Sequence, residues 1–172
     1  ELDPKSHPPR AVQSVISKAK STMLDALRLS QNAETYFEES CARVYYHYEE
    51  LLAQNNAVDF DDLLMKGVQL LQGSEEIRER YRDQYQYLMV DEFQDTNTSQ
   101  YLLTKLLTGE AQNICVVGDP DQSIYSWRNA DIRNILSFQQ DYPSTKTIAL
   151  EQNYRSTSTI LEAAKSLISS NG

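Results

Sequence analysis

The sequence is poor in glycine, cysteine and tryptophan, and it has no long hydrophobic run. Its 172 residues include five glycines, two cysteines and one tryptophan. A transmembrane helix needs about 20 consecutive apolar residues, so none is expected, and the amino terminus lacks the pattern of a signal peptide. Two cysteines without metal-ligand spacing do not make a disulfide framework. We therefore expect Cys41 and Cys115 to be buried free thiols in a reducing cytoplasm.

Phosphate-binding groups and positive charge are also scarce. None of the five glycines opens a loop of the type Gly-x-x-x-x-Gly-Lys-Ser/Thr. The formal net charge is −9, and residues 57–172 account for most of it, with 10 basic and 17 acidic side chains. This balance argues against a protein that wraps nucleic acid in a basic surface. Contact with DNA would depend on a few local side chains or on other parts of the protein.

The first third of the chain has only helical patterns. Apolar residues at helical spacing predict helices over 10–29 and 33–54. Lys18 and Lys20 lie off the first apolar stripe, which favours a solvated helix face over contact with a nucleic-acid backbone. A capping-box pattern at Asp59 predicts the start of the next helix.

The remaining two-thirds alternate strand and helix. Short, non-alternating apolar runs predict buried strands over 87–90, 113–117 and 147–150, and a helix is expected over 131–140. This order predicts an α/β fold with a partial parallel sheet flanked by helices, behind an all-helical N-terminal segment.

Polar side chains follow each predicted strand. Asp91 and Glu92 follow the first, Gln122 lies in the loop after the second, and Tyr154 and Arg155 follow the third. The carboxyl ends of parallel strands share one edge, where α/β sheets bind ligands. The two carboxylates can bind a metal ion and activate a water, the amide can orient a water or contact a terminal phosphate, and the guanidinium can bind phosphate oxygens. Taken singly, each has a plainer interpretation: a helix-capping acidic turn, a loop amide, a surface ion pair and a packing tyrosine.

Tyr125, Trp127 and Arg128 form a second candidate group. Burial in the core is the usual place of a lone tryptophan. The functional alternative is stacking on unpaired bases, which contributes about 1–3 kcal/mol per base, with arginine adding a cation–π or phosphate contact.

Three segments together resemble motifs II, III and IV of the superfamily 1 DNA helicases of the UvrD/Rep/PcrA type, in order and in spacing. They are Val-Asp-Glu-Phe-Gln-Asp-Thr-Asn at 90–97, Val-Gly-Asp-Pro-Asp-Gln-Ser-Ile-Tyr-Ser-Trp-Arg at 117–128 and Leu-Glu-Gln-Asn-Tyr-Arg-Ser at 150–156. The helical first third, including Pro-Pro-Arg at 8–10 and the segment 58–64, is similar to the helical insertion of that family. One departure is Asn129, where the family usually has glycine.

The resemblance implies a role for each motif residue. Asp91 would coordinate Mg²⁺ and Glu92 would activate the attacking water. Gln122 and Arg155 would contact the γ-phosphate of ATP, with Gln122 coupling it to the DNA site, and Tyr154 would stack near the adenine. The residues implied in single-stranded DNA contact are Tyr125, Trp127 and Arg128.

The resemblance also implies a domain organisation. Residues 1–56 would be part of a helical insertion subdomain, and residues 57–172 the later half of a RecA-like motor domain without its phosphate loop. The remainder of the helicase chain would complete the ATP site, and we expect the segment alone to be inactive. A DNA repair or replication helicase acting on single strands and junctions is the leading interpretation. The alternatives are the motor segment of a helicase–nuclease and a non-catalytic DNA-binding or interaction module.

Overall fold

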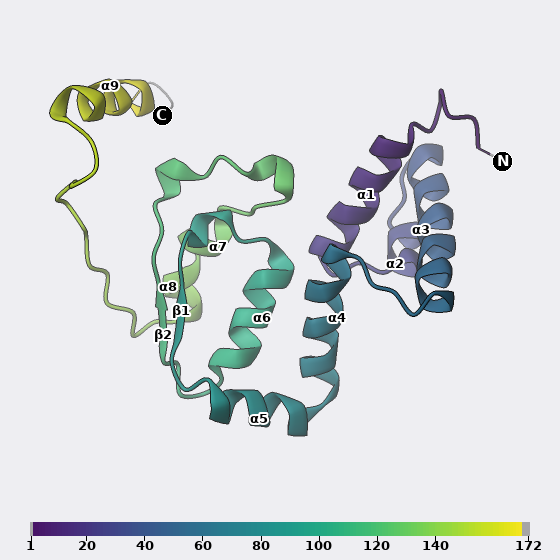
Figure 1. Cartoon of the computed structure of the whole chain (residues 1–172), viewed down its shortest axis with the longest axis horizontal. Helices are drawn as coiled ribbons and strands as arrows, with labels where there is room; N and C mark the ends of the chain where they lie inside the picture. Colours follow the sequence, from purple (N-terminus) through teal and green to yellow (C-terminus); the bar gives the residue numbers. More distant parts are fainter. Residues whose placement is uncertain (1, 170–172) are drawn as a thin grey trace. The chain divides into compact units, whose positions relative to one another are not determined.

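The computed structural model describes residues 2–169, and the chain divides into one compact unit that ends at Leu136 and a second that begins at Ser137. The elements of the first unit (Figure 1) are α1 (Pro9–Ser21), α2 (Ala26–Gln31), α3 (Tyr36–Gln54), α4 (Phe60–Gly73), α5 (Glu75–Gln84), β1 (Leu88–Val90), the 3₁₀ turn η1 (Phe93–Asp95), α6 (Thr98–Thr108), β2 (Ile114–Val116), the 3₁₀ turns η2 (Pro120–Gln122) and η3 (Ser126–Arg128), and α7 (Arg133–Leu136). The second unit holds α8 (Phe138–Asp141) and α9 (Ser158–Ile168).

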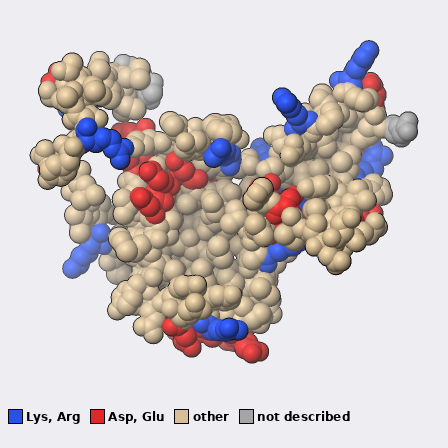
Figure 2. Space-filling view, in the orientation of Figure 1, with Lys and Arg blue, Asp and Glu red and all other residues tan. Residues whose placement is uncertain are grey.

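The α/β class is confirmed, because helices accompany a small sheet in which β1 and β2 are parallel neighbours. Helix α6 contacts β1, and helix α4 contacts both α6 and α1 (Figure 1). Both strands end at the same edge of the sheet, where η1 and η2 begin. Figure 2 shows acidic side chains gathered in this region of the surface. None of the described helices combines the length and apolar character needed to cross a membrane.

One face of this sheet is open, which corrects two predictions. Met89 is 79% exposed, and its cross-strand partner Cys115 is exposed as well. The strands are therefore not buried on both faces, and only Cys41 is a buried thiol. Successive side chains of a strand point to opposite faces. Met89 and Cys115 point to the open face, and the helices of the first unit cover the opposite face.

The predicted helix over 10–29 is instead two helices, α1 and α2. Helix α1 ends in a Schellman turn, in which the amide of Leu24 donates to the carbonyl of Ala19 at 2.8 Å. Met23 occupies the left-handed region there, with φ of 62°, which is uncommon for a residue other than glycine. Asp25 then caps α2 with its side chain. A local cap therefore interrupts an apolar pattern that is continuous in the sequence.

Two further predictions are wrong towards the end of the chain. The segment 131–140 contains α7 and part of α8 rather than one helix, and the chain passes from the first unit to the second between them. The predicted strand over 147–150 has no regular structure, and its side chains are exposed. A strand is stabilised by hydrogen bonds to a neighbouring strand, and no described segment pairs with 147–150.

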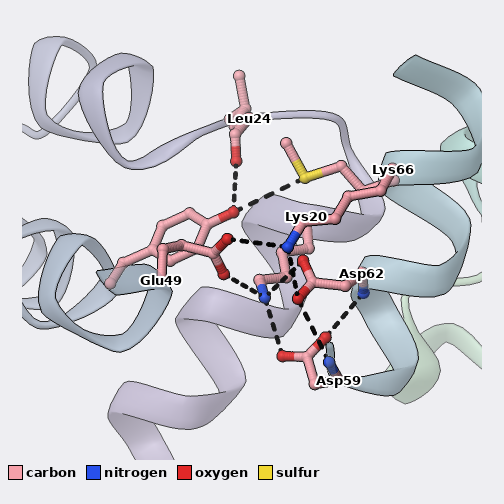
Figure 3. Close-up of polar contacts among 8 residues, drawn as sticks. Lys20, Leu24, Glu49, Asp59, Asp62 and Lys66 are labelled. Carbon is pink, nitrogen blue, oxygen red and sulfur yellow. Dashed lines mark hydrogen bonds and ion pairs between the residues drawn. The ribbon is translucent and has the colours of Figure 1, made fainter. Parts of the chain in front are cut away.

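A buried lysine joins three helices of the first unit. Lys20 of α1 is 0% exposed, so the prediction that it faces solvent is wrong. Its ammonium nitrogen lies 2.6 Å from a carboxylate oxygen of Glu49 in α3, and 2.9 Å from oxygens of both Asp59 and Asp62 at the start of α4 (Figure 3). Lys66 adds a second ammonium, 3.2 Å from Asp62. Opposite charges of the predicted segments 1–56 and 57–172 thus meet in one cluster.

The aspartates of this cluster also cap α4. One oxygen of Asp59 accepts the amide of Asp62 at 2.7 Å, and one oxygen of Asp62 accepts the amide of Asp59 at 3.3 Å, as the capping-box pattern predicted. The other oxygen of each carboxylate accepts a hydrogen bond from Lys20. Lys20 therefore fixes the first turn of α4 against α1.

The cluster is charged at neutral pH. Burial alone would lower the pKa of the Lys20 ammonium, but hydrogen bonds to Asp59, Glu49 and Asp62 together raise that pKa above its ordinary value. Burial alone would raise the pKa of Asp59, but the hydrogen bonds from Lys20 and from the Asp62 amide hold it below its ordinary value of 3.8. Both groups are therefore ionised around pH 7.

Replacing Lys20 with methionine should destabilise the fold. The substitution keeps an apolar stem but removes the ammonium that Glu49, Asp59 and Asp62 share, and only Glu49 and Asp62 keep a cation nearby, Lys66. Breaking a buried ion pair in this way costs about 3–5 kcal/mol. The free energy of unfolding, measured with urea, should fall by that amount. Lys18→Met is the matched control, because Lys18 is exposed on the same helix, and it should change stability by no more than about 0.5 kcal/mol. Equal effects of the two substitutions would contradict the role given to Lys20.

The stabilisation from Asp59 should be lost in acid. Because its pKa is lower in the folded chain than in the unfolded chain, its contribution is complete above about pH 4 and disappears as the pH falls through the folded-state pKa. Urea unfolding between pH 6 and pH 2.5 should show this loss. Asp59→Asn keeps a good helix cap but removes the titrating group, so its stability should fall less steeply over the same range. Identical slopes for the two proteins would be the contrary result.

Candidate active site at the carboxyl edge of the sheet

The loops that leave β1 and β2 begin side by side. The amide of Val117 donates to the carbonyl of Val90 at 2.8 Å, and the amide of Phe93 donates to the carbonyl of Val117 at 3.0 Å. The ladder thus continues past both strands and brings the two loops together. The acidic residues of these loops are Asp91, Glu92, Asp95, Asp119 and Asp121.

Glu92 has a strained backbone at the point where the chain leaves β1. Its φ and ψ are 50° and 42°, in the left-handed region. A non-glycine residue held there costs on the order of 1–3 kcal/mol, and such residues cluster at functional sites. The amide of Glu92 donates to a carboxylate oxygen of Asp91 at 2.9 Å. The turn therefore orients the exposed Asp91 carboxylate against the backbone of Glu92.

The side chain of Gln94 connects the two loops from below this surface. Gln94 is 1% exposed. Its amide nitrogen lies 2.8 Å from an oxygen of Glu92 and 3.3 Å from an oxygen of Asp95, and its carbonyl oxygen accepts the amide of Asp119 at 3.1 Å. Gly118 permits this approach, because a Cβ there would lie 2.6 Å from the Gln94 carbonyl oxygen.

Gln122 is held by Asp119 in the second loop. One carboxylate oxygen of Asp119 accepts the amide of Asp121 at 3.0 Å, and the other accepts the side-chain nitrogen of Gln122 at 2.7 Å. The predicted phosphate-sensing amide is therefore already oriented by a hydrogen bond within its own loop.

The aromatic and cationic residues of the candidate DNA group lie together. Trp127 is 70% exposed, so burial in the core is not its role. The guanidinium of Arg128 lies 4.7 Å from the centre of the Trp127 ring and 5.4 Å from that of Tyr125. Asn129 follows in the left-handed region with φ of 64°, a conformation that glycine and asparagine both tolerate. The departure from glycine therefore leaves the turn intact.

One pocket is lined both by the loop that follows β1 and by the segment that carries Tyr125 and Arg128. Its volume is about 760 Å³. The residues that line it are Glu92, Asp95, Asn97, Gln100, Asp121, Gln122, Ile124, Tyr125 and Arg128. The structure therefore brings together Glu92, Gln122, Tyr125 and Arg128, four of the residues singled out from the sequence. Asp91 does not line the pocket but is hydrogen-bonded to the amide of Glu92, which does.

Tyr154 and Arg155 belong to the second unit, in a turn organised by Asn153. The side-chain oxygen of Asn153 accepts the amides of Arg155 and Ser156 at 2.9 and 2.8 Å. Tyr154 is 93% exposed, so it does not serve as a packing residue within the described chain. The exposed side chains of Tyr154 and Arg155 are both available for contact with a ligand.

Sequence reasoning gave no role to Gln94 or Asp119, although both lie in the quoted motifs. The available signal was the spacing: in the run Asp-Glu-Phe-Gln, a glutamine two residues after Glu92 can reach back to that carboxylate if the chain turns. A glycine immediately before Asp119 was the second signal, because glycine marks close backbone approach.

Fold and site together define the class: an α/β protein with a pocket at the carboxyl edge of two parallel strands, the edge at which such sheets bind ligands. The sequence model of the UvrD/REP helicase N-terminal domain matches residues 1–143. The chain therefore belongs to the UvrD/REP helicase family.

Relatives from several bacteria agree with this assignment. The ATP-dependent DNA helicases PcrA of Bacillus subtilis (strain 168) and Staphylococcus aureus (strain Mu50) are each 48% identical to the chain over 170 residues, and the PcrA protein of Leuconostoc citreum is 46% identical. The alignments cover 99% of this chain and 23% of each relative. The chain therefore spans about a quarter of the length of these helicases.

Gly118→Ala should disturb the contact between the loops. The added methyl group would meet the Gln94 carbonyl oxygen, a methyl group of Ile135 at 2.9 Å and the amide nitrogen of Phe93 at 3.2 Å, and such overpacking costs about 1–3 kcal/mol. Gly67→Ala is the control. Gly67 lies inside α4 with nothing within 4 Å of its added methyl group, so the helix should gain about 0.5–1 kcal/mol. Urea unfolding measures both, and a neutral Gly118→Ala would contradict the close approach.

Proposed function

We propose that this chain is part of an ATP-dependent DNA helicase, in which ATP hydrolysis drives translocation on single-stranded DNA and unwinding at single-strand/duplex junctions. The observation that carries the proposal is the shared pocket, because Glu92 and Gln122 line it together with Tyr125 and Arg128. A translocase needs its hydrolytic residues linked to its DNA contacts. The membership of the UvrD/REP family supports the same assignment.

On the nucleotide side, Glu92 acts as the base that takes a proton from the attacking water. The left-handed turn and the hydrogen bond from Gln94 hold its carboxylate at the pocket wall. Gln122 contacts the γ-phosphate through its side-chain amide. Arg155 contributes a permanent charge to the same phosphate, and Tyr154 stacks near the adenine. Water activation and charge neutralisation are the main tasks of such a site.

Asp91 is the proposed protein ligand of Mg²⁺. Among the described residues, no group of three or more His, Cys, Asp or Glu side chains is arranged so that it could hold a metal ion. Magnesium in nucleotide sites keeps several waters and takes one or two carboxylates together with the phosphates. The single exposed carboxylate of Asp91 is therefore sufficient as the protein ligand of such an ion. One of its oxygens already accepts a hydrogen bond from the Glu92 amide. The ion would supply charge neutralisation between the phosphates.

On the DNA side, Tyr125, Trp127 and Arg128 contact single-stranded DNA. Stacking on aromatic rings tolerates any base, which suits a translocase that must step along arbitrary sequence. The acidic balance of the chain requires local contacts of this kind.

The rest of the protein completes both sites. We assign residues 1–56 to a helical insertion and residues 57–172 to the later half of a RecA-like motor domain. The 172 residues contain no phosphate loop, so we expect no ATP turnover from them alone. In the whole protein, acting in the cytoplasm in DNA repair or replication, that loop would hold the β- and γ-phosphates.

Glu92→Gln in the full-length protein tests the proposal. Loss of the base should lower DNA-stimulated ATP turnover about 10²- to 10⁴-fold. Nucleotide and single-stranded DNA affinities should stay within about threefold, a free-energy change of less than 1 kcal/mol, because the amide keeps the size of the side chain.

Gln84→Glu is the control, since Gln84 ends helix α5 on the exposed surface, and its turnover should match that of the unmodified protein. Near-normal ATP turnover in the Glu92→Gln variant would show that Glu92 is not the base that activates the attacking water. Absence of ATP hydrolysis in the unmodified full-length protein, with DNA binding retained, would favour the non-catalytic module.

A further inference from the structure

We infer that Gln94 is a positioning residue for ATP hydrolysis: its buried amide holds the Glu92 carboxylate and ties it to the loop that carries Gln122. The inference rests on the proposed function of Glu92. It concerns a residue that neither contacts the pocket nor has an evident chemical role. Its basis is the set of hydrogen bonds on both ends of one side chain.

The orientation of the Gln94 amide is fixed by its partners. Two carboxylate oxygens, from Glu92 and Asp95, face one end at 2.8 and 3.3 Å, and only an N–H donor is favourable there. A backbone N–H donor, from Asp119, faces the other end at 3.1 Å, where only an oxygen is favourable. A flipped amide would lose all three bonds. Each end of Gln94 therefore has a definite function.

The bonds form a continuous chain across the two loops. Glu92 accepts from Gln94, Gln94 accepts from the Asp119 amide, and the Asp119 carboxylate accepts from Gln122 at 2.7 Å. The hydroxyl of Ser123 adds a contact to the backbone carbonyl of Gln94 at 3.4 Å. A displacement of the loop that carries Asp119 would therefore also displace the Gln94 side chain, which holds the Glu92 carboxylate.

The position of Glu92 depends strongly on this contact. Its backbone is in the left-handed region, and its carboxylate lies in the exposed part of the loop. Among the residues that the structure describes, Gln94 is the buried residue whose side chain donates a hydrogen bond to the Glu92 carboxylate. Without that bond, the carboxylate can take other rotamers, and misplacing a catalytic group by about 1 Å can lower the rate about 100-fold.

Gln94→Met in the full-length protein tests the inference, because methionine keeps the volume and removes every hydrogen bond of the amide. Turnover at saturating ATP and DNA should fall about 10- to 100-fold, as expected for a misplaced base. The dissociation constant of a fluorescent ATP analogue should change less than about threefold, which is below 1 kcal/mol. This separation of rate from affinity marks a positioning role.

Asn134→Leu is the matched control for loss of a buried amide. Asn134 is 7% exposed, and its side-chain nitrogen donates to the carbonyl of Thr96 at 2.9 Å, so it supports the same turn without touching Glu92. Thermal unfolding should show comparable destabilisation of both variants. Turnover of Asn134→Leu should remain within about threefold of the unmodified protein. Equal loss of turnover in the two variants would reduce Gln94 to a structural residue and overturn the inference.

The double variant Glu92→Gln/Gln94→Met isolates the connection to the base. If Gln94 acts through Glu92, single-turnover rates of the double variant should equal those of Glu92→Gln, since residues that work as a unit are not additive. Multiplied losses would overturn the inference and leave the function of Glu92 intact. A normal rate for Glu92→Gln alone would instead refute the proposed function, so the two failures are distinguishable.

Discussion

The buried amide of Gln94 is the constraint on which the candidate site depends. The two strands are only three residues long, and the backbone ladder beyond them ends with the hydrogen bond from Phe93 to Val117. Beyond that point Gln94 connects the two loops, because one end of its side chain binds Glu92 and the other binds the backbone of Asp119. Gly118 makes the contact possible by leaving the space that a Cβ would fill. The loop after β1 with Glu92, the loop after β2 with Gln122, and the segment with Tyr125 and Arg128 thus line one pocket.

A second polar contact, in the helical part, performs a comparable task. Lys20 gathers carboxylates from α3 and α4 around a fully buried ammonium. Desolvation opposes such an arrangement, and it persists because three opposite charges and the α4 cap satisfy each other. The result is that α1 and α4, which come from segments predicted as different domains, share one charged core. Orientation of the helices in the first unit is therefore set by charge as well as by apolar packing.

Much of the fold followed from local pattern. The ends of β1 and β2, the parallel order and the cap at Asp59 come from short-range rules, and the structure agrees with them. Lys20 was missed because its carboxylate partners lie 29 to 42 positions along the sequence, and periodicity counts only apolar residues. The break after α1 was missed because a methionine takes the left-handed position usually left to glycine. The predicted strand over 147–150 does not form, because no described segment pairs with it. Four of the nine pocket residues, Glu92, Gln122, Tyr125 and Arg128, were named from their motifs, whereas Gln94 required the three-dimensional turn.

Hydrogen exchange at the Asp119 amide tests the central claim most directly, that a buried side chain joins the two loops. Two-dimensional NMR of the 172-residue chain should show slowed exchange of this amide, because it donates to Gln94. In Gln94→Met the Asp119 amide should exchange close to the unprotected rate, while the Phe93 amide, bonded to Val117, stays protected. An Asp119 amide that exchanges equally fast in both proteins would contradict the account.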